Sequence, residues 1–311
     1  MKVLIVCSAN SGKIVPFVTE QADDLIKIGV EISFFTINGK GIWGYLKNIP
    51  KYIKTVKKIN PDIIHAHFGL SGLLANFIRS KPVVTTFHGC DINKKSNLKY
   101  SQISIKLSAH SIFVSDKQIE KAKPKGNYSL IPCGTNPNIF YPIEKLKSRE
   151  ILKLDDHKKI ILFASSFSIG VKNYTLAKKA MEILNDNSDE ILELSGYSRE
   201  EVAKLMNACD LVLLTSIREG SPQVIKEAML CNCPIVSTDV GDVKQLINGI
   251  EGCYITSFEP DDVAEKISLA LNFAKEKKRN LARNKIFSLG LDSGSIANKI
   301  KNVYSDILKE S

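Results

Sequence analysis

Two glutamates stand close together in the second half of the chain, Glu219 and Glu227, with seven residues between them. The segment between them follows an apolar run and contains Ser221 and Pro222, which suit the N-cap and the first position of a helix. A helix that starts after a strand presents backbone N–H groups and the positive end of its dipole, which attract a phosphate. The rise of a helix predicts carboxylates on the order of 9 Å apart, enough to reach two parts of a nucleotide sugar. These residues alone leave one alternative open, a surface loop with two solvated glutamates.

Histidines follow or lie within two strand candidates of the first half. His88 comes directly after an apolar run and precedes Asp91, so we expect both at the carboxyl end of a strand, where parallel sheets bind ligands. A lone histidine is otherwise more often structural. His65 and His67 alternate on another strand and share one face, but the sequence offers no third ligand beside them, and we predict no metal site.

The turn after the first strand contains Asn10 and Gly12 and has a superficial likeness to a phosphate-binding P-loop. Cys7 replaces the first glycine of that motif, and Ile14 replaces its Ser/Thr. We therefore interpret Asn10 and Gly12 as part of a strand-to-helix turn that faces the cleft.

Short apolar runs that alternate with helical stretches must position these residues. The expected strands are Val3–Cys7, Glu31–Thr36, Ile63–His67, Val83–Phe87, Ser111–Val114, Tyr128–Ile131, Ile160–Phe163, Ile191–Leu194, Leu211–Leu214, Pro234–Ser237 and Cys253–Thr256. The expected helices include Pro16–Ile28, Gly44–Lys58, Gly69–Arg79, Tyr174–Leu184, Arg199–Ala208, Pro222–Leu230, Asp261–Glu276 and Ser295–Lys309. Continuous apolar strands between helices predict an α/β fold with parallel sheets covered on both faces.

The alternation breaks near residues 138–150, where Pro137, Pro142 and a run of charges intervene. The net charge changes there as well, from +12 over Met1–Glu150 to −2 over the remainder. We expect two doubly wound, Rossmann-like domains, 1–143 and 144–290, with ligands in an interdomain cleft. Residues 291–311 are expected to form a C-terminal crossing helix that packs back on the first domain.

The composition excludes several classes of protein. The 311 residues are 44% hydrophobic and 24% charged, as in a globular protein, and no apolar segment reaches the ~18–20 residues of a membrane span. Seven scattered cysteines do not form a disulfide framework and favour the cytoplasm. No G-x-G-x-x-G follows a strand, which argues against a dehydrogenase, and no nucleic-acid module accompanies the basic charge, so we expect no nucleic-acid partner.

The segment from Glu219 to Glu227, followed by Pro234-Ile235-Val236-Ser237-Thr238-Asp239-Val240-Gly241, resembles the retaining nucleotide-sugar glycosyltransferases of family 4. These enzymes have the two-domain GT-B fold. The segments Asp62–His67, Thr85–Asp91, Ile131–Asn136 and Val171–Asn173 resemble further parts of that family, in the same order along the chain.

The resemblance assigns roles by position. Glu219 would contact donor-sugar hydroxyls, Glu227 the ribose hydroxyls, and Lys172 the diphosphate, while His88 would act near the donor sugar. Carboxylates suit hydroxyls because each accepts two hydrogen bonds. The remaining residues expected on the donor side are Gly220, Ser221, Pro222, Gln223, Ser166, Gly196, Tyr197 and Arg218, and those on the acceptor side are Asn10, Gly12 and Asp91.

The chain departs from the family at one place. Many members carry an arginine about five residues before the lysine, where this sequence has Phe167. Ser166 and Ser168, or Arg218, are the residues that we expect to substitute for it.

The resemblance also implies a reaction. We expect transfer of a sugar from a UDP- or GDP-sugar to an acceptor hydroxyl with retention, without a metal or other cofactor, and the sequence has no Asp-x-Asp motif. The expected pathway is assembly of a capsule, exopolysaccharide or teichuronic-acid-like polymer on a lipid-linked acceptor. A nucleotide-sugar epimerase of the same architecture and a non-catalytic nucleotide-sugar-binding protein are the alternatives.

A basic, amphipathic segment, Gly44–Lys58, follows Trp43 and carries five lysines. Lysines with interleaved aromatic residues can dock on an anionic membrane, so we expect a cytoplasmic protein that is peripheral at the inner face of the plasma membrane. A solvated helix face is the alternative.

Overall fold

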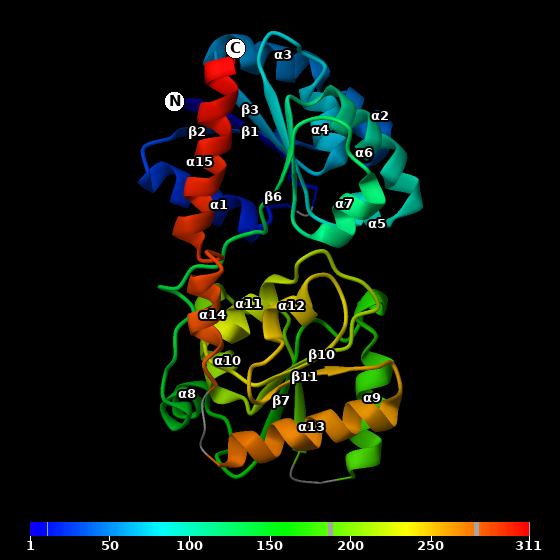
Figure 1. Cartoon of the computed structure of the whole chain (residues 1–311), viewed down its shortest axis with the longest axis vertical. Coiled ribbons are helices and arrows are strands. Elements are labelled where there is room, and N and C mark those ends of the chain that lie inside the picture. Colours follow the sequence, from blue (N-terminus) through cyan, green and yellow to red (C-terminus); the bar gives the residue numbers. More distant parts are fainter. Residues whose placement is uncertain (11, 186–188, 277–279, 311) are drawn as a thin grey trace. The chain divides into compact units, whose positions relative to one another are not determined.

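The structure, a computed structural model, describes residues 1–10, 12–185, 189–276 and 280–310. Within these residues the chain forms two compact units (Figure 1). Unit 1 holds Met1–Gly134 together with the segment from Ser293 onward, and unit 2 holds Thr135–Asp292. Each unit is built on one sheet whose neighbouring strands pair in parallel. The α/β class and the two tandem parallel sheets predicted from the sequence are therefore confirmed.

Unit 1 contains a six-stranded sheet in the order β2-β1-β3-β4-β5-β6. Every residue of β3 and β4 is buried, because helices cover both faces of the sheet and leave no side for water. The strands are β1 (Lys2–Ser8), β2 (Glu31–Ile37), β3 (Ile63–His67), β4 (Val83–Phe87), β5 (His110–Phe113) and β6 (Tyr128–Leu130). The helices are α1 (Pro16–Lys27), α2 (Gly41–Leu46), α3 (Ile49–Ile59), α4 (Gly69–Ala75), α5 (Cys90–Asn93), α6 (Lys95–Leu107), α7 (Asp116–Ala122) and α15 (Ser293–Glu310).

The single helix predicted over Gly44–Lys58 is wrong, because the structure divides it into α2 and α3. Pro50 lies in the first turn of α3, where the backbone N–H that proline lacks would have no helical partner. Inside a longer helix the same proline would remove a hydrogen bond and clash with the preceding turn. The side chain of Asn48 stabilises the junction by donating to the carbonyl oxygens of Gly44, at 2.7 Å, and Asn38, at 3.0 Å.

Helix α15 comes last in the chain and packs against α1 in unit 1 (Figure 1). Its buried residues recur every three or four positions, as expected of a helix with one apolar face: Ile296, Ala297, Ile300, Tyr304 and Ile307.

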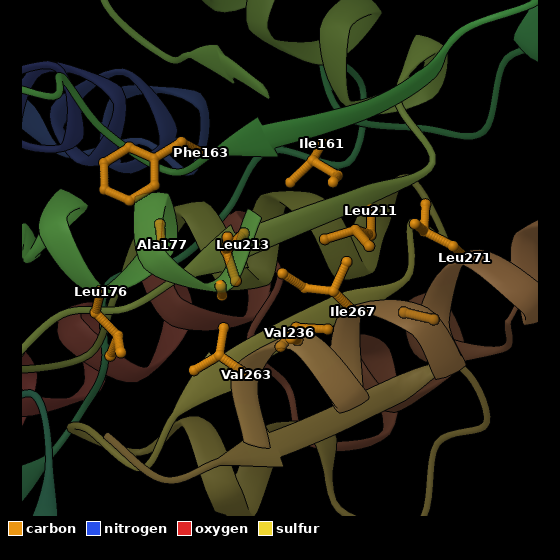
Figure 2. Close-up of a cluster of buried hydrophobic side chains, with 13 residues drawn as sticks. Ile161, Phe163, Leu176, Ala177, Leu211, Leu213, Val236, Val263, Ile267 and Leu271 are labelled. Carbon is orange, nitrogen blue, oxygen red and sulfur yellow. The ribbon is translucent and has the colours of Figure 1, made fainter. Parts of the chain in front are cut away.

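Unit 2 contains a five-stranded sheet in the order β11-β10-β9-β7-β8. Its strands are β7 (Lys159–Phe163), β8 (Asp189–Glu193), β9 (Leu211–Leu214), β10 (Ile235–Thr238) and β11 (Cys253–Thr256). Its helices are α8 (Lys145–Leu152), α9 (Tyr174–Leu184), α10 (Arg199–Ala208), α11 (Gln223–Leu230), α12 (Val243–Ile247), α13 (Pro260–Lys275) and α14 (Ala282–Ser288), with a 3₁₀ turn, η1 (Gly170–Lys172). Figure 2 shows one part of the core, where apolar side chains of β7 and β9 meet those of α9 and α13.

The charged run that the sequence suggests as a break between domains belongs largely to α8. Arg149 of this helix is 2% exposed, and its guanidinium bonds Asp210 at 2.9 Å and the carbonyl oxygen of Ala208 at 2.9 Å. This buried arginine attaches α8 to the start of β9, so the segment is part of the folded unit.

Within the described chain, no helix combines the length and the apolar character that crossing a membrane requires.

Candidate functional site

The residues predicted for the donor lie in loops that follow the strands of unit 2. In this sheet β8 pairs with one side of β7, and β9, the next strand along the chain, pairs with the other side. The direction in which strands are added therefore reverses between β7 and β9. Open parallel sheets bind ligands at such a switch point, beyond the carboxyl ends of the strands. Lys172 lies between β7 and β8, and Glu219 follows β9.

Lys172 and Glu219 form an ion pair across this switch point. The Nζ atom of Lys172 lies 2.7 Å from Oε1 of Glu219, and the two side chains are 20% and 17% exposed. The buried Ser216 donates its hydroxyl to the same carboxylate oxygen at 2.7 Å. The hydroxyl of Thr215 bonds the carbonyl oxygens of Lys172 and Asn173, each at 3.0 Å, which fixes the loop after β7 against the loop after β9. The structure therefore brings together two residues that lie 47 positions apart in the sequence.

Glu227 has a partner that the sequence did not indicate. Its side chain is 5% exposed and lies 2.6 Å from Nη1 of Arg199, the first residue of α10. The start of α10 is fixed by a capping box between Ser198 and Glu201, and the guanidinium of Arg199 also stacks over the ring of Phe140 at 4.7 Å. The sequence around Arg199 gives no sign of this pairing, so only the three-dimensional contact with Glu227 identifies Arg199.

Ser221 does not cap α11, contrary to the prediction. The helix begins at Gln223, Pro222 is the flanking residue with an extended ψ of 115°, and the Ser221 hydroxyl donates to Asp242 at 2.6 Å. This hydrogen bond directs the hydroxyl away from the backbone of the helix and joins the loops after β9 and β10.

Two glycines allow those loops to approach each other. Gly241 has a φ of +57°, and a Cβ atom built on it would lie 2.3 Å from the carbonyl oxygen of Gly220. Only glycine tolerates both the left-handed backbone and this contact. Gly241 therefore sets the position of the loop that carries Glu219 and Gly220.

The loop after β7 shows how the chain is built where the family has an arginine. Phe167 packs its ring on Tyr174, with centroids 3.8 Å apart, and its N–H donates to Glu193 at 2.9 Å. Ser166 and Ser168 bond each other at 3.0 Å. Phe167 is thus a packing residue, and the two hydroxyls lie together beside it.

The other predicted donor-side residues make fewer contacts. Arg218 is exposed, and among the described residues no hydrogen bond or ion pair joins it to Lys172 or Glu219. Gly196, with a φ of +82°, and Tyr197, 44% exposed, form the turn between β8 and α10.

The predicted acceptor-side residues belong to unit 1. The side chain of Asn10 bonds the backbone of Gly39 in both directions, at 2.7 and 2.8 Å, and Gly12 has a φ of +86°. The carboxylate of Asp91 accepts the N–H groups of Gly69, His88 and Gly89 at 2.8–3.3 Å. Burial raises the pKa of Asp91, although these N–H groups lower it. Asp91 therefore holds together the loops that follow β3 and β4.

His88 lies in a row of imidazoles. Its Nε2 is 2.9 Å from Nδ1 of His67, its Nδ1 is 3.5 Å from Sγ of Cys133, and the rings of His67 and His88 are stacked. His67 stacks in turn on His65, whose ring bonds Tyr304 of α15 at 2.5 Å and Thr86 at 2.7 Å. Burial lowers the pKa of His67 to about 3 and that of His65 well below its usual value. Both are neutral rings at physiological pH.

In the part of the chain that the structure describes, no three or more His, Cys, Asp or Glu side chains form a group that could hold a metal ion. His65 and His67, which share a face of β3 as expected, instead make hydrogen bonds and ring contacts within unit 1.

Comparisons with known proteins agree with this arrangement. Residues 2–138 match the family described as Glycosyltransferase Family 4, and residues 168–272 match Glycosyl transferases group 1. The chain is 27% identical over 247 residues to a glycosyltransferase assigned to teichuronic acid biosynthesis in Bacillus subtilis, which covers 70% of this chain and 63% of that protein. It is 29% identical over 312 residues to the N,N'-diacetylbacillosaminyl-diphospho-undecaprenol alpha-1,3-N-acetylgalactosaminyltransferase of Campylobacter jejuni, with 85% and 82% of the two chains covered.

The fold is similar to that of Anabaena HepE, solved in complex with UDP-glucose, with a TM-score of 0.77 at 19% identity over 98% of this chain and 100% of that one. The two family matches together span well over half of the chain, one in each unit. The chain therefore belongs to the family 4 glycosyltransferases, and its two parallel-sheet units are those of the GT-B fold.

Proposed function

We propose that the protein transfers a sugar from a nucleoside-diphosphate sugar to an acceptor hydroxyl with retention of configuration. One observation carries the proposal: Lys172 and Glu219 pair at 2.7 Å across the switch point of the unit 2 sheet. A cation and a carboxylate held there suit the two halves of such a donor, since one neutralises phosphate and the other accepts hydroxyl hydrogen bonds. HepE, which shares the fold, was solved with UDP-glucose.

Each residue has one task in this proposal. Glu219 accepts hydrogen bonds from the donor sugar, Glu227 accepts them from the ribose, and Lys172 stabilises the charge that grows on the diphosphate as it leaves. Backbone N–H groups near Ser221 and Gln223 assist Lys172. The cation and these dipoles are in place before the reaction, so no reorganisation is needed in the transition state.

The proposed step takes place on one face of the sugar. The bond from the anomeric carbon to the phosphate oxygen breaks, the acceptor oxygen bonds the same carbon on the same face, and the acceptor proton passes to the departing phosphate. Lys172 supplies the positive charge that this phosphate needs, and we therefore propose that no metal is required.

For the acceptor we propose a lipid-linked saccharide in the assembly of a bacterial surface polysaccharide. The Campylobacter relative is named for a diphospho-undecaprenol acceptor, and the Bacillus relative is assigned to teichuronic acid biosynthesis. Such an acceptor is presented at a membrane, and the exposed Lys47, which follows α2, together with the exposed lysines of α3 would bring unit 1 to the inner, anionic face.

The test is incubation of the purified protein with UDP- and GDP-sugars, with and without a lipid-diphosphate saccharide. We expect nucleotide release that depends on the acceptor and a product with the donor's anomeric configuration, measured by NMR. An altered sugar still attached to its nucleotide would instead indicate an epimerase. Tight binding with neither release nor alteration would indicate a non-catalytic protein.

A further inference from the structure

His67 and His88, two neighbouring histidines of unit 1, are joined by one hydrogen bond. Nδ1 of His67 and Nε2 of His88 are 2.9 Å apart, a hydrogen-bond distance, so one of the two nitrogens must carry the hydrogen. A neutral imidazole has a single N–H, and the assignment on one ring therefore determines the other.

The surroundings of His67 decide between the two arrangements. His67 is fully buried, and no described residue offers a hydrogen-bond partner to its Nε2. If the proton lay on Nε2, a buried N–H would be orphaned, which is rarer in proteins than an under-satisfied acceptor. The proton of His67 therefore lies on Nδ1, and His67 donates to Nε2 of His88.

We propose that His67 is a positioning residue that holds His88 neutral, with its single proton on Nδ1. His88 then offers an N–H donor from Nδ1, which in the structure is directed at Sγ of Cys133, 3.5 Å away. Sulfur is a weak acceptor, so an oxygen of the donor sugar would be a better partner for this N–H. This inference rests on the proposed function and on the role near the donor sugar that the family resemblance implies for His88, and it adds the residue that positions His88.

His67 is itself held from its other side. Its ring stacks on His65 at a centroid distance of 4.6 Å, and both nitrogens of His65 are hydrogen-bonded, to Tyr304 and Thr86. Because His65 cannot turn without losing these bonds, it fixes the plane in which His67 lies.

The same arrangement opposes protonation of His88. An imidazolium carries N–H on both nitrogens, so Nδ1 of His67 would have to accept and its proton would move to the buried Nε2. Among the described groups that contact His88 are Cys133, the apolar rings of Phe17 and Phe68, and Asp91, which accepts the His88 backbone N–H. A charged Asp91 favours the imidazolium, and burial, which raises the pKa of Asp91, weakens that effect.

Long-range ¹H–¹⁵N spectra of the ¹⁵N-histidine-labelled protein test the proposal directly. The five histidines would be assigned by single substitutions. At pH 7 we expect His67 and His88 each to carry one proton, on Nδ1. A proton on Nε2 of His67, or a doubly protonated His88, would overturn the proposal, and neither reading depends on catalysis.

Two substitutions extend the test. His67→Asn keeps an N–H donor near the place of Nδ1, whereas His67→Phe keeps the ring shape and removes the donor. We expect the Phe variant to raise the pKa of His88, to mix its tautomers and to lower kcat about tenfold, the effect of one hydrogen bond, whereas the Asn variant stays near wild type. A His110→Asn change, on a histidine that bonds Ser129, is the control and should leave the His88 signals unchanged.

The positioning role of His67 and the proposed function can fail separately, and the results differ. If His67→Phe leaves the tautomer and the pKa of His88 unchanged, His67 is not a positioning residue. If the spectra agree with the proposal but no sugar is transferred by the wild type, the proposed function fails and the assignment of the proton stands.

Discussion

The cation at the switch point is paired with a carboxylate of the same unit. Lys172 and Ser216 both donate to Oε1 of Glu219, so a diphosphate that approaches Lys172 competes with that carboxylate. Glu219 thus keeps Lys172 in position before the donor arrives. In the proposed reaction, a phosphate that attracts Lys172 would leave Glu219 available to the hydroxyls of the sugar.

We expect Glu219→Gln to lower kcat on the order of a hundredfold or more, since an interaction that matters most in the transition state is weakened. The side chain is partly exposed in a loop, so the fold should persist. Steady-state transfer assays and circular dichroism measure the two effects. Glu200→Gln, a charge change at an exposed position of α10, is the matched control. A folded Glu219→Gln enzyme with normal turnover would contradict the proposed role.

Lys172→Ala should lower both the affinity for the nucleoside diphosphate and kcat, whereas Arg218→Ala should change either by less. The reason is that Lys172 is fixed by Glu219 and Arg218 is exposed. Titration calorimetry with UDP and GDP, together with transfer rates, gives the comparison. A larger loss in Arg218→Ala would mean that Arg218 takes the place of the arginine that the family carries near the lysine.

At the residue scale, the sequence predicts a site component only where a motif contains it. Glu219, Glu227 and Lys172 belong to such segments, and their placement in loops after parallel strands follows from the alternation of strands and helices. Arg199 lies in no such segment, and the segment that ends at His67 does not reveal what His67 does. Both roles depend on contacts with Glu227 and His88, 28 and 21 positions away. No local pattern encodes a partner at such a separation.

At the scale of elements, the junction between the loops after β9 and β10 is the most sensitive to change. Gly241→Ala should strain a left-handed backbone and also place a methyl group 2.3 Å from the carbonyl oxygen of Gly220. We expect a loss of stability above the ~1–2 kcal/mol of the backbone term alone, together with a higher KM for the donor as the loop shifts. Thermal unfolding and donor KM are the measurements.

Gly249→Ala provides the control for that change. Gly249 also has a positive φ, +77°, but a Cβ atom there meets nothing within 4 Å. This variant should lose only the backbone term and keep the donor KM of the wild type. Equal effects in the two variants would show that contact with Gly220 does not position the loop.

Elements with a clear apolar period were predictable, and those that depend on distant partners were not. β3, β4, β9, β11, α9 and α10 lie at the residues expected from the sequence. From the sequence, the charged segment of α8 is typical of a linker. Arg149 is buried in the core only because Asp210, which is 61 positions away, pairs with it in the folded unit. The predicted start of α11, Pro222, is one residue too early, because the hydroxyl of Ser221 bonds Asp242 and does not cap the helix.

At the scale of the molecule, charge and exposed aromatic surface occur together in unit 1. The five lysines Lys47, Lys51, Lys54, Lys57 and Lys58 are all exposed, and Trp43 of α2 is 76% exposed. Each basic residue near an anionic leaflet contributes about 1 kcal/mol at low salt, and screening reduces this. We expect the protein to co-sediment with phosphatidylserine-containing vesicles, and the variant with these lysines changed to Gln to lose most of that binding.

The matched control removes the same charge from another part of unit 1, through Gln at the exposed Lys94, Lys95, Lys106, Lys123 and Lys125. This variant should bind vesicles nearly as well as the wild type if position matters. Equal loss in both variants would mean that net charge alone attracts the protein, and no binding by the wild type would remove α2 and α3 as a membrane surface.

The discontinuity of unit 1 has a consequence for biosynthesis. Tyr304 of α15 bonds His65, a residue made 239 positions earlier, so the core of unit 1 lacks a helix until the ribosome has passed all of unit 2. Unit 2 is continuous in sequence and can fold during translation. Unit 1 stays incomplete over the same period, because α15, which covers α1, has not yet been made. The order of folding is then the reverse of the usual order, in which the first domain to emerge folds first. A chain truncated after Asp292 and released from the ribosome should therefore resist protease across Thr135–Asp292 and be cleaved within the residues that precede it.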